Sequence, residues 1–363
     1  MNTIVHSCRI LGVAIFLGLF AILGSAGSAD ARNVPGSAAA GIPPLVTASN
    51  DLIITDVLSE IRDLSGNGQA QAGKGVRFVA LDPEILSDAP NAHRIGQSAV
   101  PNFRGFSASI LDEGGLGLYT VGHYRDIDAG TELQADLFTF GGFLSYQASR
   151  ELFLTIGAVG EVSQGTTPFN QGTLDSAGYG VAAGLNYDFG NNISVSALAG
   201  YLMLDYETTR GNGAFSGSFD ASRYFLDLSG EYSFSWDDHD TITTAGLRYF
   251  YQDNDSYVES GGAAVSGFAV SALAATASTK TYFGADPEFR PFAEASGRVN
   301  LTDDFEGPNN VVVLDDNSVA IRFGGGFNYS TTGGTSFEVG AGVNLTDDGY
   351  NGVDATIRAL IAF

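Results

Sequence analysis

Cysteine, lysine and long hydrophobic runs are scarce in this chain, and each scarcity excludes a class of protein. The only cysteine is Cys8, so the chain beyond it can form no disulfide and offers no thiolate nucleophile or metal ligand. Two lysines and a net charge of -24 create a field that repels nucleic acid, which excludes DNA and RNA as partners. No run reaches the roughly 20 apolar residues that a membrane-spanning helix needs.

The N-terminus carries the features of an export signal. Arg9 precedes an apolar run from Ile10 to Leu23, and small residues follow up to Ala29-Asp30-Ala31. A basic region, a short apolar region and an A-x-A site together define a secretory signal peptide. We therefore predict that residues 1–31 form a signal peptide cleaved by the export machinery, with Ala29 and Ala31 at the cleavage site.

The composition beyond the signal is rich in glycine and aromatic residues. The chain has 48 glycines, 25 phenylalanines and 15 tyrosines among 363 residues. An acidic, exported and cysteine-poor chain of this kind is typical of an outer-membrane β-barrel. An exported soluble β protein shares the composition, so the strand pattern has to separate the two.

Residues 32–115 form an N-terminal extension in which one segment has a clear period. Residues 32–50 are small and contain proline and glycine, which is typical of a linker. Residues 51–64 place apolar side chains on one helical face and predict an amphipathic helix, through Ile54, Val57, Leu58 and Ile61. Residues 65–115 are irregular apart from a possible strand at Val76–Leu81.

Segments that alternate apolar and polar residues recur from Leu116 to the C-terminus. In Phe337–Leu345, for example, apolar residues alternate with Glu338, two glycines and Asn344. A period of two describes a strand between two environments, and about 9–11 residues of tilted strand cross a bilayer. Twelve strands are predicted, at 116–125, 133–147, 151–163, 176–189, 193–207, 221–236, 241–253, 274–284, 290–301, 318–329, 335–345 and 353–363.

The connections between these segments separate a membrane barrel from a soluble sandwich. Short connections alternate along the chain with longer ones, at 164–175, 208–220, 254–273 and 302–317. That sorting is typical of an up-and-down barrel with tight periplasmic turns and long outer loops. We predict an all-β, twelve-stranded antiparallel transmembrane barrel over 116–363. It would be a monomer in the outer membrane of a Gram-negative-type envelope, in contact with lipid and lipopolysaccharide.

The face opposite the apolar one carries charges of both signs. If the apolar faces meet lipid, these charges line the lumen. They can pair into a network that stiffens the wall, or they can grip a segment threaded through the pore. The predicted lumen-lining residues are Asp188, Asp227, Glu231, Arg248, Glu294, Arg298, Arg322, Glu338, Asp354 and Arg358.

No constellation in the sequence supports catalysis, a metal or a cofactor. Asp237-Asp238-His239-Asp240 combines groups that can ligate a metal or move a proton, but it falls in a predicted turn, where aspartate is common. Acidic pairs such as Asp303-Asp304 and Asp347-Asp348 fall in predicted outer loops and are interpreted as solvated charge. Weak Ca²⁺ or Mg²⁺ bridging to lipopolysaccharide is the alternative for them, but it is the less favoured one, because no loop has EF-hand spacing.

The C-terminal 250 residues or so resemble the autotransporter β-domain, the translocator of type V secretion. The resemblance rests on the twelve segments, on Thr281–Gly284 followed by Phe289–Glu294, and on the C-terminal Ile-Arg-Ala-Leu-Ile-Ala-Phe. It implies a barrel with an N-terminal helix through its lumen, which brings a passenger to the cell surface. It also implies that Phe363, with the apolar residues Ile357 and Ile361, is the signal read by the barrel-assembly machinery.

Two departures from that family leave the function open. Only residues 32–115 precede the barrel and they lack β-helix repeats, and the helix at 51–64 does not directly precede the first strand. The chain can be a translocator of its own short segment, a passive porin-like channel for small solutes, or a structural or adhesive barrel acting through its outer loops. The helix can occupy the lumen as a plug or pack outside the barrel.

Overall fold

The structure is a computed structural model that describes residues 35–67, 107–109, 116–128, 133–149, 151–190, 192–236, 239–284, 289–305, 307–308, 319–330, 335–346 and 351–361. The predicted signal peptide with Ala29 and Ala31, the possible strand Val76–Leu81 and the terminal Phe363 lie outside the described residues.

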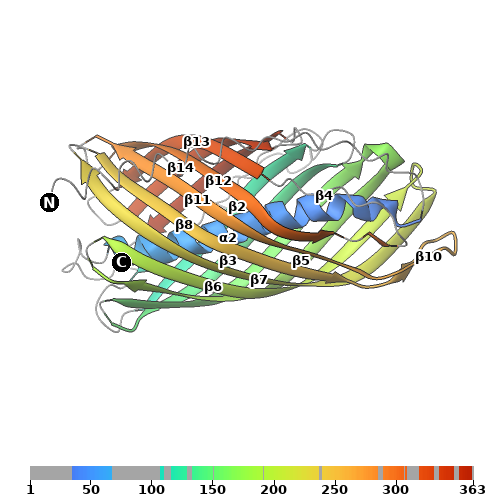
Figure 1. Cartoon of the computed structure of the whole chain (residues 1–363), viewed down its shortest axis with the longest axis horizontal. Helices are drawn as coiled ribbons and strands as arrows, with labels where there is room; N and C mark the ends of the chain where they lie inside the picture. Colours follow the sequence, from blue (N-terminus) through green and yellow to red (C-terminus); the bar gives the residue numbers. More distant parts are fainter. Residues whose placement is uncertain are drawn as a thin grey trace, which may run out of the picture.

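The strands form one closed antiparallel barrel (Figure 1). Each strand pairs with the next, and the last pairs with the first through Asp354 opposite Arg125. The predicted twelve-stranded barrel is therefore confirmed, and a two-sheet sandwich is excluded. A short β1 (Ser107–Ser109) adds to the barrel beside β2. The barrel strands are β2 (Leu116–Asp128), β3 (Gln134–Gln147), β4 (Leu152–Thr167), β5 (Gly172–Asp188), β6 (Ile193–Arg210), β7 (Phe215–Trp236), β8 (His239–Asn254), β11 (Phe268–Phe283), β12 (Phe289–Phe305), β13 (Val319–Ser330), β14 (Thr335–Thr346) and β15 (Asn351–Ile361).

The two ends of the barrel differ in their connections. One end, the turn end, carries the connections 148–151, 189–192, 237–238, 284–288 and 331–334. The other, the loop end, carries the turns 168–171 and 211–214 and the segment 255–267, which folds into a hairpin of β9 (Tyr257–Val258) and β10 (Ala264–Val265). Because the strand number is even, β2 begins and β15 finishes at the same end, the turn end.

Two predicted long connections are wrong. Most residues of 164–175 and 208–220 belong to β4, β5, β6 and β7, which extend until only tight turns remain, with η3 (Pro168–Asn170) in the first of them. In the second turn, Gly211, Asn212 and Gly213 all have positive φ, a conformation that glycine and asparagine tolerate best. The alternation of apolar and polar residues ends before these strands end, because the outward-facing residues near the loop end are polar.

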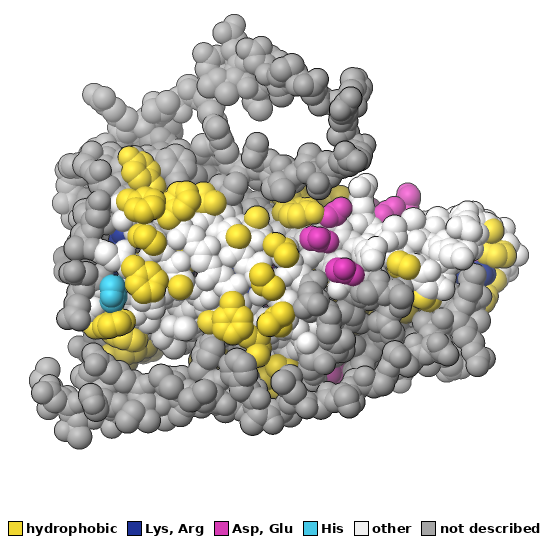
Figure 2. All heavy atoms as spheres, turned by 90° about the horizontal axis from the view of Figure 1, so that it is seen from above, with side chains coloured by type: hydrophobic (Ala, Val, Ile, Leu, Met, Phe, Trp, Pro, Cys, Tyr) yellow, Lys and Arg dark blue, Asp and Glu magenta, His cyan; other side chains and the backbone are white. Residues whose placement is uncertain are grey.

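The outer surface has an apolar band followed by carboxylates. Apolar side chains exposed on the wall lie nearer the turn end, and acidic side chains lie beyond them toward the loop end (Figure 2). On β6 and β7, Asp205 lies directly opposite Asp220, and both are exposed. Asp175 of β5, which is half-buried, lies opposite the exposed Glu207. The band matches a lipid-facing surface, and the carboxylates mark the boundary of that band toward the loop end.

A helix runs along the inside of the barrel (Figure 1). It consists of η1 (Ser37–Gly41) and α2 (Ile42–Asn67), which begins at the loop end and finishes toward the turn end. The predicted linker at 32–50 is therefore wrong over most of its length, and the helix predicted at 51–64 is the second part of a longer one. Pro43 and Pro44 fit the first turn of a helix, where their missing N–H groups need no partner.

The lumen, and not lipid, surrounds this helix. Leu45 and Ile54 are fully buried, and α2 lies against β2, β3, β4, β5 and β6. Packing outside the barrel is excluded for the described helix. Within the described residues, no helix is both long enough and apolar enough to cross a membrane.

The lumen as the candidate functional site

The half of the lumen nearer the loop end is apolar and filled. There the first part of α2 packs against inward-facing side chains of the long strands in one cluster of buried apolar residues. The rings of Tyr206 and Phe219 stack at 5.0 Å, and that of Tyr257 from the hairpin stacks on Phe219 at 4.9 Å. The buried residues of this half include Ile42, Leu45, Val46, Leu202, Leu204, Phe225, Phe250, Val270 and Phe268.

One ion pair is embedded at the border of this apolar half. Arg223 Nη1 donates to Glu161 Oε2 at 2.7 Å, and both side chains are fully buried. Ser49 of α2 joins them: its hydroxyl accepts from Arg223 Nη1 at 2.8 Å and donates to Glu161. Arg223 Nε also donates to Gln252 Oε1 at 2.8 Å. A buried pair of this kind is stable only when its remaining donors and acceptors are satisfied, and α2 supplies part of that satisfaction.

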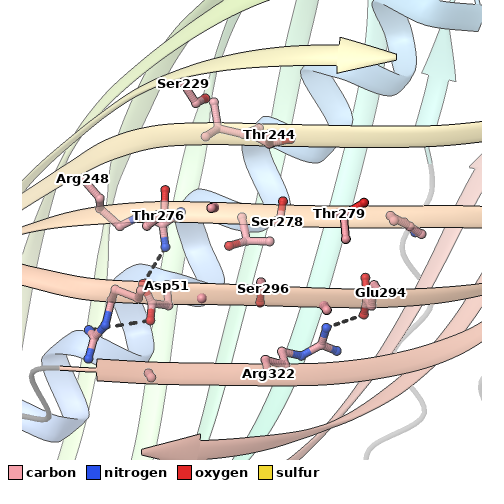
Figure 3. A pocket seen from close by; sticks show the side chains of 18 of the residues that line it. Asp51, Ser229, Thr244, Arg248, Thr276, Ser278, Thr279, Glu294, Ser296 and Arg322 are labelled. Carbon is pink, nitrogen blue, oxygen red and sulfur yellow. Dashed lines mark hydrogen bonds and ion pairs between the residues drawn. The ribbon is translucent and has the colours of Figure 1, made fainter. Parts of the chain in front are cut away.

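A second set of charges ties α2 to the opposite wall. Asp51 accepts from Arg248 Nη1 at 2.5 Å, and its other oxygen lies 3.8 Å from Arg298 (Figure 3). Arg248 also donates to Asp227 Oδ2 at 3.2 Å. These contacts join α2 to β7, β8 and β12 at mid-height of the lumen.

Among the charged side chains of α2, the structure describes Asp51 alone, so contacts of the others with Arg322, Glu294 or Glu338 lie outside the described residues. Arg322 donates to Asp354 at 2.6 and 2.8 Å and also to Glu294, so its partners belong to the wall. Glu338 accepts from Lys280 Nζ at 2.6 Å and from the Tyr282 hydroxyl at 3.0 Å. Both readings of the lumenal charge therefore apply: part of it stiffens the wall, and part of it holds the helix.

The other predicted site residues have different positions. Glu231 lines the lumenal cavity, whereas Asp188 lies at the turn end, where it accepts the N–H of Gly190 at 2.7 Å. The side chains of Arg358, Ile357 and Ile361 lie outside the described residues, although their backbones belong to β15.

In the turn Asp237–Asp240, the described side chains of His239 and Asp240 have structural partners. Asp240 accepts from Arg290 Nη1 at 2.6 Å, and the ring of His239 lies edge-on to Trp236 at 4.7 Å. Asp237 and Asp238 lie outside the described residues. Nowhere in the described ranges do three or more His, Cys, Asp or Glu side chains gather so that they could hold a metal ion.

Sequence reasoning missed Arg223, Glu161 and Ser49, which make the most buried contact of the lumen. Arg223 precedes Tyr224, an outward residue of a predicted strand, so the period of two already placed it on the inward face. Ser49 lay in the stretch interpreted as a linker.

A cavity of about 240 Å³ with many polar lining residues lies between α2 and the wall of β7, β8, β11, β12 and β13. It exists because the helix lies against the β2–β6 side of the barrel and leaves the opposite wall uncovered. Small hydroxyl side chains line this wall between the charged ones, at Ser229, Thr244, Thr276, Ser278 and Ser296 (Figure 3). The lumen is thus apolar toward the loop end and polar toward the turn end.

A family model described as the autotransporter β-domain matches residues 118–349. This chain belongs to that family. Autotransporter β-domains are outer-membrane barrels of Gram-negative bacteria that serve transport and are not catalytic by themselves. Among curated proteins, none matches the sequence.

Three solved autotransporter structures are similar to this one. The translocator domain of NalP from Neisseria meningitidis has a TM-score of 0.59 at 15% identity, with 68% of this chain and 87% of that chain covered. The β-domain of Bordetella BrkA has a TM-score of 0.53 at 13% identity, with 68% and 98% covered. The transport unit of AIDA-I from Escherichia coli has a TM-score of 0.52 at 14% identity, with 68% and 89% covered. At such identities the likeness shows the autotransporter fold.

Proposed function

We propose that this autotransporter barrel delivers its own N-terminal segment across the outer membrane and then keeps α2 in the lumen as a plug. The observation that supports this proposal is the direction of the chain. Gly36 lies beside the hairpin at the loop end, and α2 runs from there toward the turn end. A barrel of this type has both ends of its strand array in the periplasm, which puts the turn end there and the loop end outside.

The proposed route starts with export and ends at the cell surface. After cleavage behind Ala31, Arg32 becomes the first residue of the mature chain, only a few positions before Gly36. That short segment then leaves the barrel at its outer mouth. In the proposed membrane state the barrel is a monomer, with the apolar band in lipid and the carboxylates beyond it at the level of lipopolysaccharide.

The accessibility of the N-terminus tests this proposal directly. A peptide tag inserted between Ala31 and Arg32 should bind its antibody on intact cells, because it would lie outside the outer mouth. The same tag in the turn at Gly190 should bind only after the outer membrane is permeabilised, and a tag at Gly262 of the hairpin should bind on intact cells. A tag before Arg32 that stays hidden in intact cells, while the Gly262 tag is accessible, would contradict the proposal.

Assembly is proposed to depend on the terminal strand. Deleting Phe363 should lower the outer-membrane yield, because that residue fits the signal read by the barrel-assembly machinery. Lysine at Ile357 should impair insertion more than lysine at Ile361, since a lipid-facing charge costs about 2–4 kcal/mol at the midplane and less near the rim. Equal yields of the wild type and the Phe363 deletion in outer-membrane fractions would count against this dependence.

The polar cavity favours a passive channel as the second candidate function. Its hydroxyl and charged lining can hold water and small ions beside α2. A channel, however, also needs a path through the apolar half of the lumen. Single-channel conductance before and after deletion of residues 35–67 separates the two functions. A sharp rise on deletion supports the plug, and large conductance in both proteins supports the channel.

A further inference from the structure

The outer hairpin β9–β10 and the start of η1 meet around one buried ion pair at the loop end. Arg210, the last residue of β6, donates through Nη2 to Glu259 Oε2 at 2.6 Å and through Nε to both carboxylate oxygens at 3.1 Å. Glu259 belongs to the loop of the hairpin and is only 4% exposed, and Arg210 is 7% exposed. A bidentate pair of this geometry fixes the hairpin in one position over the mouth.

The same carboxylate binds the N-terminal segment. The backbone N–H of Gly36 donates to Glu259 Oε1 at 3.0 Å. One residue further on, the Ser37 hydroxyl accepts from Asn170 Nδ2 of the turn between β4 and β5 at 3.1 Å. Glu259 therefore has two different partners, a strand of the wall and the chain that enters the lumen.

The position of Gly36 leaves little room for a side chain. Its φ is +80°, and a Cβ placed there would lie 3.0 Å from Val265 of the hairpin and 3.0 Å from Pro308. The chain thus passes beneath the hairpin at a point too narrow for most side chains. The Arg210 guanidinium also lies 3.9 Å from the ring centre of Phe215.

Other contacts also hold the hairpin: the Ser260 N–H donates to the Ser216 carbonyl of β7 at 2.7 Å, and the Ser216 N–H donates to the Ser260 hydroxyl at 3.0 Å. Its own ladder consists of two residue pairs, and its main apolar contacts are the Tyr257 ring on Phe219 and the buried Val265. Burial raises the pKa of Tyr257 to about 12, so that hydroxyl stays neutral and adds no charge to the site. The Arg210–Glu259 pair is a buried polar link that joins the hairpin, the wall and the backbone of Gly36 at one carboxylate.

We propose that Arg210 and Glu259, with the hairpin 257–265, form a clasp that fixes where the N-terminal segment leaves the barrel and closes the mouth around it. This inference rests on the proposed function, because it takes the loop end as the outer mouth. Arg210 and Glu259 are positioning residues in this clasp: they hold the segment through the backbone of Gly36 and keep the hairpin seated on the lumen.

The test compares conductance of purified barrels in planar bilayers. The double variant Arg210→Met and Glu259→Gln removes the pair without leaving a lone buried charge. Gly36→Val leaves the pair intact but fills the narrow point with a side chain. Both should open at least about tenfold more often than the wild type, the change expected when a closed state loses about 1.4 kcal/mol. Glu207→Gln, on the exposed outer face of β6, is the matched control and should leave the opening frequency unchanged.

A disulfide provides a readout that general loss of stability would not give. Cysteines at Ser37 and Asn170, whose side chains are in contact, should restore closure of the double variant when oxidised and not when reduced. Folding of each protein is checked by its electrophoretic shift on heating. Folded variants that open no more often than the wild type, or an open double variant that the disulfide fails to close, would overturn the clasp.

The result can be told apart from failure of the proposed function. If the tag before Arg32 stays hidden while the clasp variants open, the clasp closes the pore but the N-terminal segment is not displayed. If that tag is accessible and deletion of 35–67 opens the pore while the clasp variants stay closed, delivery stands and the clasp is refuted.

Discussion

Replacing Arg223 by methionine should destabilise the barrel more than the loss of a less buried lumenal charge such as Arg248 or Arg322. The guanidinium is fully buried and makes hydrogen bonds to Glu161, Ser49 and Gln252. Methionine fills much of the same space but leaves the Glu161 carboxylate buried with the Ser49 hydroxyl as its remaining partner. The variant should also weaken the seating of α2, because Ser49 belongs to that helix.

The magnitude follows from burial. Removing one partner of a buried ion pair costs about 3–5 kcal/mol, because the other charge is left uncompensated. Replacing both partners by uncharged groups of similar volume is often close to neutral. We therefore expect a loss of about 3–5 kcal/mol for Arg223→Met, and a much smaller loss when Glu161→Gln is added.

Urea unfolding of the refolded barrel in detergent or lipid vesicles measures these differences, with the slope m checked for constancy. Arg290→Met is the matched control, because Arg290 pairs with Asp240 where both side chains are partly exposed. An exposed pair contributes about 0–1 kcal/mol. The reasoning would be refuted if Arg223→Met and Arg290→Met lost equal stability, or if adding Glu161→Gln brought no recovery.

Three further predictions concern the helix, the wall and the lipid face. Arg248→Ala should raise the leak conductance more than Arg322→Ala, because Arg248 binds Asp51 of α2 and Arg322 binds wall residues; a larger leak from Arg322→Ala would contradict this. Gly200→Val should lower the melting temperature, since a Cβ at Gly200 would lie 2.0 Å from the Phe225 ring; an unchanged melting temperature would show that the ring moves freely. Leu228→Lys, on the lipid face, should cost about 2–4 kcal/mol of unfolding free energy in bilayers and little in short-chain detergent micelles; equal losses in both would place this residue outside the membrane.

The strands could be predicted because their lipid-facing halves alternate strictly between apolar and other residues. In Tyr179–Phe189, for example, each residue between the apolar ones is small or polar, and the structure places the apolar ones outward. Where the outward residue becomes Asp205 or Glu207, the hydrophobic signal ends while the ladder continues to Arg210. The Gly211-Asn212-Gly213 turn was the remaining local signal for where that strand finishes.

The first part of the helix could not be predicted from its own residues. Ser37–Asn50 consists largely of small residues with two prolines, and such a segment has little helical stability in isolation. Its stability comes from the barrel wall, which buries Leu45 and Val46 completely. The partners of the lumenal charges could not be predicted from the sequence either, because the position of α2 in the lumen decides that Asp51 meets Arg248 and Arg298.

The carboxylates on the outside of β5, β6 and β7 set the depth of the barrel in the membrane. Asp205 opposite Asp220 and Asp175 opposite Glu207 lie directly beyond the apolar band, and like charges in such cross-strand pairs repel each other unless water or ions screen them. If the barrel moved by one pair of residues toward its turn end, these four carboxylates would enter the hydrocarbon core, where no water or ions screen them. If the barrel moved the other way, toward its loop end, apolar side chains of the band would be exposed to water. The apolar band and the carboxylates therefore favour one height of the barrel in the membrane, and the length of the strands beyond it sets how far the loop end projects from the lipid.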